Sequence, residues 1–137
     1  MSVDRNNPEW WVTAIVIFGA ALMAAGGAIA LIHPAMLVSP TAEINGATHV
    51  YAGYLVSRNL ALAAMLLAML GMRARKILGG LMVLTAIIQF LDAGMDLLEG
   101  RWAIVPGVLV FGTLFLFGAA RLSGGAFWKA GAWRSAG

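Results

Sequence analysis

Long apolar segments alternate with short polar ones along the chain, and four of the apolar segments are about twenty residues long. They cover residues 11–32, 50–70, 77–98 and 102–120. A helix rises about 1.5 Å per residue, so about 20 residues cross the roughly 30 Å hydrocarbon core of a bilayer. The pattern therefore predicts an all-α integral membrane protein, an antiparallel four-helix bundle that forms a single transmembrane domain over residues 1–137.

Composition supports the membrane assignment and narrows the chemistry. Hydrophobic residues make up 61% of the chain, charged residues only 11%, and the mean hydropathy is +0.87. A soluble domain carries far more charge. Cysteine is absent, which excludes disulfides, thiolate metal sites and thiol redox chemistry. The pI of about 10.0 reflects lysines and arginines that flank the spans, so no nucleic-acid partner is predicted.

The lysines and arginines also predict how the chain crosses the bilayer, because their translocation is disfavoured and they accumulate on the cytoplasmic side. One side has only Arg101, and Arg58 lies inside a span. Seven basic residues flank the other side: Arg5, Arg73, Arg75, Lys76, Arg121, Lys129 and Arg134. We therefore expect both termini in the cytoplasm. The first span is expected to stay uncleaved, because its apolar run exceeds that of a signal peptide.

Two segments outside the spans are distinctive. The first loop, residues 33–49, contains two prolines but stays apolar in its first half. It either rests on the membrane interface as a loop, which we favour, or forms a short surface helix that begins at Ser39 and Pro40. The tail, residues 121–137, interleaves aromatic and basic side chains, and we expect it to lie in the interface of the inner leaflet.

Polar side chains inside the spans are the most informative feature of the sequence. On the third span they recur every three or four residues, which places them on one helix face: Thr85, Gln89, Asp92, Asp96 and Glu99. The second span has a similar face with Tyr51, Tyr54, Arg58 and the adjacent Asn59. From the cytoplasmic ends, Arg58 is about 18 Å and Asp92 about 22 Å along their helices. We therefore expect the two polar faces to meet.

The charges at this meeting point predict a proton site. A charged side chain at mid-membrane costs about 2.5–3.5 kcal/mol on insertion scales, so it needs a partner or water. Arg58 against Asp92 and Asp96 leaves one carboxylate over, and we expect a shared or exchangeable proton there, with the carboxylate nearer to Arg58 ionised. The predicted catalytic residues are Arg58, Asp92 and Asp96. The predicted ligand-binding residues are Tyr51, Tyr54, Asn59 and Gln89.

The other charged and titratable residues receive simpler interpretations. Glu99 and Arg101 lie at the outer boundary and are expected to be ordinary solvated charges. His33 and His49 bracket the first loop without the close spacing of a metal site, so no metal is predicted, and no cofactor either. An Arg–Asp pair that only fixes the register of the helices is the structural alternative to a functional site.

The second span contains Ser57-Arg58-Asn59-Leu60-Ala61-Leu62. The third contains Gln89-Phe90-Leu91-Asp92-Ala93-Gly94-Met95-Asp96 and is followed by Gly100-Arg101-Trp102. In these elements the chain resembles the DoxX-like superfamily, and more narrowly its small four-helix bacterial proteins of unknown function. The resemblance implies a bundle in the bacterial inner (plasma) membrane, and some similar proteins are membrane partners of quinone-linked oxidoreductases. It transfers no catalytic residue, because this subgroup has no agreed mechanism.

Three functions stay open at this stage, including whether the protein is an enzyme. The first is a pocket that binds a small lipophilic ligand and handles a proton on it, with Asp92 as base or anion, Asp96 as the protonated acid and Arg58 as electrostatic orienter. The second is a proton-coupled small-molecule carrier, as a monomer or homodimer. The third is a non-catalytic accessory subunit that holds a partner membrane subunit of an oxidoreductase complex.

Overall fold

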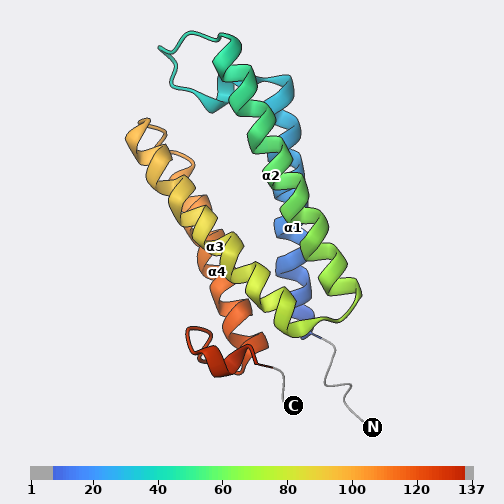
Figure 1. Ribbon diagram of the computed structural model, residues 1–137. Helices are drawn as coiled ribbons and strands as arrows, with labels where there is room; N and C mark the ends of the chain where they lie inside the picture. The colour runs from blue at the N-terminus through green and yellow to red at the C-terminus, as the bar shows by residue number, and fades with distance from the viewer. Residues whose placement is uncertain (1–7, 135–137) are drawn as a thin grey trace.

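The computed structural model describes residues 8–134 of the chain, which fold into four long helices and two short 3₁₀ turns (Figure 1). The long helices are α1 (Trp10–Ile32), α2 (Gly46–Gly71), α3 (Arg75–Leu98) and α4 (Val105–Ser123). Consecutive helices run in opposite directions (Figure 1). Each of the four is long and apolar enough to cross a membrane. The predicted all-α, antiparallel four-helix membrane bundle is therefore confirmed.

Helix α2 begins at Gly46, four residues before the predicted span, because the residue before it forms a capping box. The side chain of Asn45 accepts hydrogen bonds from the backbone N–H groups of Ala47, at 3.0 Å, and Thr48, at 3.3 Å. In return, the backbone N–H of Asn45 donates to the hydroxyl of Thr48 at 3.4 Å. These bonds satisfy donors that a helix start leaves unpaired. The polar start of α2 thus extends the helix beyond its apolar run.

The first loop contains one 3₁₀ turn, η1 (Pro34–Leu37), and no helix begins at Ser39 and Pro40. The short surface helix considered from the sequence is therefore not formed. A proline at the first position of η1 fits the fixed backbone angle of the pyrrolidine ring. The helical turn thus forms directly after α1, and the rest of the loop runs without regular structure to Asn45.

The bundle is built from two hairpins, because α1 packs along α2 and α3 packs along α4. Figure 1 shows the hairpins meeting at the end that holds the chain termini, here called the terminal end, and diverging toward the other, distal end. The buried apolar core lies in the terminal half and draws on all four helices: Val12, Val16, Ala20, Met23, Leu62, Ala63, Leu66, Leu78, Met82, Ala86, Phe115, Ala119 and Leu122. The distal half of the described bundle lies outside this core cluster.

Glycines allow close packing in the terminal half, both between the hairpins and within one of them. A Cβ atom added at Gly19 of α1 would lie 2.5 Å from the ring of Phe115 of α4, which is itself 1% exposed. A Cβ at Gly118 of α4 would overlap the terminal methyl of Met82 of α3. Small residues at such positions let membrane helices approach closely. The terminal half is therefore the closely packed part of the fold.

Polar contacts close the terminal end. Arg121 Nε donates to Glu9 Oε1 at 2.6 Å, and Trp11 Nε1 donates to Glu9 Oε2 at 2.6 Å. This carboxylate thus ties the start of α1 to the end of α4.

The tail turns back onto the bundle after α4 and includes a second 3₁₀ turn, η2 (Ala130–Ala132). The indole of Trp133 lies against Gly79 of α3, and its Nε1 donates to the backbone oxygen of Phe127 at 2.6 Å. Trp128, in contrast, is 72% exposed. The two tail tryptophans therefore differ, since one packs on the protein and the other faces outward.

Candidate functional site

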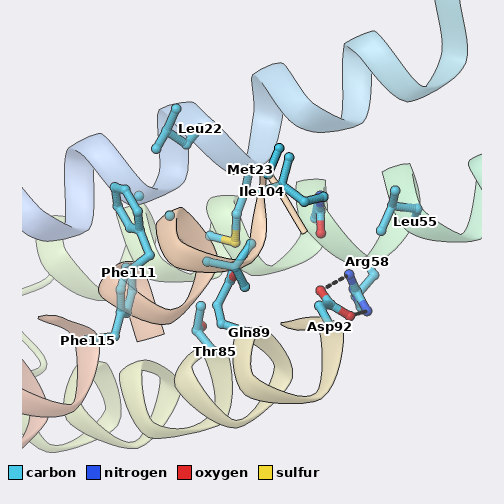
Figure 2. Close-up of a pocket in the computed structure, with 15 residues that line it drawn as sticks. Leu22, Met23, Leu55, Arg58, Thr85, Gln89, Asp92, Ile104, Phe111 and Phe115 are labelled. Atoms are coloured by element: carbon cyan, nitrogen blue, oxygen red, sulfur yellow. Dashed lines mark hydrogen bonds and ion pairs between the residues drawn. The ribbon is translucent and has the colours of Figure 1, made fainter. Parts of the chain in front are cut away.

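Arg58 of α2 and Asp92 of α3 form a bidentate ion pair between the hairpins (Figure 2). Arg58 Nη1 donates to Asp92 Oδ1 at 3.1 Å, and Nη2 donates to Oδ2 at 2.8 Å. Their side chains are 36% and 34% exposed. A charge-assisted pair of this geometry makes both charges tolerable within membrane helices. The expected contact between the polar faces of the second and third spans is present.

Asp96 pairs with a different arginine. Arg101 Nη1 donates to Asp96 Oδ1 at 3.1 Å, and Arg101 Nη2 donates to the backbone oxygen of Met36 in the first loop at 2.7 Å. The side chains of Arg101 and Asp96 are only 25% and 13% exposed. The expectation that Arg101 is an ordinary solvated charge is therefore wrong. The expectation that one carboxylate is left over is also wrong, because each of the two aspartates is paired with its own arginine.

The end of α3 explains why Arg101 lies beside Asp96. Gly100 has a φ of +73°, a left-handed conformation that glycine adopts without strain. The chain then turns back, so that the N–H of Arg101 bonds the backbone oxygen of Asp96 at 2.8 Å and the N–H of Gly100 bonds that of Leu97 at 3.2 Å. This pair of bonds is the Schellman helix ending. It holds Arg101 over the last turn of α3, where its guanidinium meets the carboxylate.

A cavity of about 510 Å³ lies between the hairpins next to the Arg58–Asp92 pair (Figure 2). All of its polar lining residues come from α2 and α3: Arg58, Asn59, Thr85, Gln89 and Asp92. The lining from α1, from α4 and from the turn before α4 is apolar: Gly19, Leu22, Met23, Ala103, Ile104, Gly107, Val108, Phe111 and Phe115. The cavity thus has a polar wall facing an apolar wall.

A second cavity of about 380 Å³ continues the first toward the distal end. The two share six lining residues: Leu55, Asn59, Gln89, Asp92, Ile104 and Val108. The second also reaches Tyr51, Asp96 and Arg101. We call the joined cavities the inter-hairpin cleft. Its charged lining residues are two arginines and two aspartates, each arginine paired with one aspartate.

Three polar groups of the cleft lack an internal partner among the described residues. The carboxamides of Asn59 and Gln89, both half-buried, make no hydrogen bond within that part of the chain. Arg58 Nε is buried and also has no partner there. Thr85 differs, since its hydroxyl donates to the backbone oxygen of Leu81 at 2.8 Å. Unpaired polar groups in an apolar setting are costly, so a ligand that bonds the two half-buried carboxamides lowers the free energy of the site.

The structure brings together most of the residues that the sequence singled out. Arg58, Asp92, Asn59 and Gln89 line the larger cavity, while Tyr51 and Asp96 line only the second. Tyr54 is placed elsewhere, since it is 73% exposed and lines neither cavity.

The apolar wall and Arg101 were missed by sequence reasoning. Phe111, Ile104 and their neighbours on this wall carry no signal, because they look like any other residue of an apolar span. Arg101 did carry one, because a glycine directly after a helix commonly turns the next residue back over it.

Comparison of the chain with protein-family models, with curated proteins and with solved structures gives no match. Within residues 8–134, no group of three or more His, Cys, Asp or Glu side chains is arranged to hold a metal ion. The candidate site is therefore defined by its own geometry, as a cleft with one polar and one apolar wall.

Proposed function

We propose that the protein binds a small amphipathic molecule within the membrane, in the inter-hairpin cleft. The observation that carries the proposal is the division of the cleft into two walls. The apolar body of the molecule lies against α1 and α4, and its polar head meets Asn59, Gln89 and the Arg58–Asp92 pair on α2 and α3.

The size and lining of the cleft support this function. Sites for small molecules are commonly about 300–1,000 Å³ in volume, mainly apolar, with a few polar groups that fix orientation. The larger cavity, at about 510 Å³, is within that range. Two unpaired carboxamides, one on α2 and one on α3, would be costly on membrane helices that served only packing. They have a clear use if a ligand supplies their partners.

Ligand binding fits the geometry better than acid–base catalysis. Both carboxylate oxygens of Asp92, which lines both cavities, accept bonds from Arg58, whereas Asp96 lines only the second cavity and accepts a bond from Arg101 at Oδ1. A general base needs a carboxylate oxygen that can reach a substrate proton. In this arrangement the carboxylates balance charge and position the arginines.

A proton-coupled carrier is the second candidate, favoured by one observation. The Arg58–Asp92 pair joins α2 of one hairpin to α3 of the other in the half of the bundle outside the buried core. Protonation of Asp92 would remove this electrostatic link and let the hairpins separate. Uptake into vesicles that depends on a pH gradient would distinguish the carrier from a binding protein.

The test of ligand binding compares what co-purifies with wild type, Asn59→Leu and Gln89→Leu. Thr113→Val is the matched control, because Thr113 is an exposed polar residue of α4 that lines neither cavity. Native mass spectrometry with solvent extraction should find a small amphiphile on wild type and on the control, and at least tenfold less on the other two. Equal retention by all four proteins would refute binding at the carboxamides.

We further propose that both termini are cytoplasmic. Six basic residues of the terminal end support this topology: Arg73, Arg75, Lys76, Arg121, Lys129 and Arg134. Arg5, which also entered the sequence argument, lies outside the described residues. The natural chain has no cysteine, so Thr41→Cys and Ala130→Cys give clean labelling sites. In intact spheroplasts an impermeant maleimide should label only Thr41→Cys, and the reverse pattern would invert the topology.

We also propose membership of the DoxX-like superfamily and a place in the bacterial inner membrane. Support comes from the Arg58-Asn59 element opposite the Asp92 and Asp96 pair, which is the part of the chain that carries the resemblance. An accessory role beside a membrane oxidoreductase is compatible with ligand binding. It predicts that a larger enzyme co-purifies with the gently solubilised protein.

A further inference from the structure

We infer that the inter-hairpin cleft selects an amphiphile whose head group is uncharged and carries an oxygen acceptor. The inference rests on the proposed function, since it names the chemical class of the molecule bound by the same cleft. Two independent observations carry it, the charge balance of the lining and the kind of polar group left without a partner.

The charges that line the cleft cancel within the protein. Arg58 is paired with Asp92, and Arg101 is paired with Asp96, at shortest distances of 2.8 and 3.1 Å. A charged head group would either stay unpaired in an apolar surrounding or break one of these pairs and leave its other member unpaired. An uncharged head group avoids both costs. The cleft therefore discriminates against anions and cations alike.

The polar wall offers a ligand more donors than acceptors. The carboxamides of Asn59 and Gln89 each have two N–H donors and one acceptor oxygen, and the partly exposed guanidinium of Arg58 beside them can only donate. A carbonyl or hydroxyl oxygen on the head group satisfies such donors without bringing a charge. The ligand class is thus a neutral amphiphile with an oxygen head and an apolar body for the wall that includes Phe111 and Leu22.

The test uses three probes with the same ten-carbon chain and different heads. They are N,N-dimethyldecanamide, which is neutral and has a carbonyl oxygen, decanesulfonate, which is a permanent anion, and decyltrimethylammonium, which is a permanent cation. Binding is measured by native mass spectrometry of the protein in phosphatidylcholine nanodiscs, relative to partition into empty nanodiscs. Wild type should hold the amide at least tenfold better than either ion.

Charge variants provide a second, sharper readout. Asp92→Asn leaves Arg58 unpaired, so the preference should shift toward decanesulfonate. Arg58→Gln leaves Asp92 unpaired, so it should shift toward decyltrimethylammonium. The double variant removes both charges and should return to the neutral probe. Even if a single variant fails to fold, the wild-type and double-variant series still decide the inference.

The outcomes separate the inference from the proposed function. Specific binding in which an ion equals or exceeds the amide on wild type would overturn the inference and leave ligand binding intact. Binding of no probe above the empty-nanodisc level would overturn both. Preference for the amide with no shift toward the matching ion in either folded single variant would contradict the assignment of selectivity to the Arg58–Asp92 pair.

Discussion

Arg58 and Asp92 lie on different hairpins, and each terminal nitrogen of the arginine donates to one oxygen of the aspartate, at 3.1 and 2.8 Å. The buried core ties the hairpins together only in the terminal half. In the distal half, the ion pair and the bond from Arg101 to Met36 bridge segments that come from different hairpins. The pair therefore has two roles, since it lines the cleft and links the two hairpins across it.

This link between the hairpins predicts strong energetic coupling between Arg58 and Asp92. Arg58→Gln and Asp92→Asn should each destabilise the protein by about 1–3 kcal/mol, because each leaves a partly buried charge without its partner. The double variant should lose clearly less than the sum, with a coupling energy of about 0.5–3 kcal/mol. Reversible denaturation in mixed micelles measures all four proteins. Strict additivity would mean that the pair contributes nothing to stability.

The contacts of Arg101 predict a local effect at the distal end. Arg101→Gln removes the charge that balances Asp96 and weakens the link to Met36 in the first loop. Hydrogen exchange should rise in the loop at residues 33–45 and at the end of α3, with little change in the terminal half. Glu99→Gln is the control, because Glu99 is exposed and lines neither cavity. Equal hydrogen exchange in the two variants would show that Arg101 does not stabilise the first loop.

The terminal end predicts a pH dependence. The Arg121 guanidinium, helped by the indole N–H of Trp11, holds the pKa of the Glu9 carboxyl below its usual value of 4.5. A lowered pKa in the folded state stabilises the fold above pH 4.5, and this contribution is lost as the pH falls through the lowered pKa. The Tm difference between wild type and Glu9→Gln should therefore be present at neutral pH and shrink below pH 4.5. A constant difference across that range would disprove the linkage.

The spans and the ion pair could be predicted from the sequence because both depend on short-range patterns. Apolar runs of about twenty residues mark membrane helices whatever their partners are. Polar residues at intervals of three and four fix a helix face, and Arg58 and Asp92 were the costly residues on two such faces. Their contact follows from the requirement that charges in a membrane be paired.

Which side of α2 faces the cleft could not be predicted from the sequence, because it depends on how the hairpins pack. At about 100° per residue, Leu55 and Asn59 lie about 60° and 100° to one side of Arg58, whereas Tyr54 lies about 40° to the other. The cleft is on the Leu55 and Asn59 side. Tyr54 shares the polar stripe in sequence but faces outward, since the contacts that set the helix rotation are made by apolar and small residues.

Blocking the cleft without disturbing the fold tests the central claim most directly. Gly107 lines the larger cavity, and a Cβ atom added there meets nothing within 4 Å. Gly107→Leu should therefore occupy part of the cavity without a clash at its Cβ atom. Gly94→Leu is the matched control, because Gly94 is also helical, has equally open surroundings and lines neither cavity.

The decisive measurement is binding of N,N-dimethyldecanamide to the wild type and to these two variants in phosphatidylcholine nanodiscs, together with their Tm. We predict at least a tenfold loss of binding for Gly107→Leu, wild-type binding for Gly94→Leu, and a Tm no lower than that of wild type for both. If Gly107→Leu binds the probe as well as wild type does, the inter-hairpin cleft is not the ligand site.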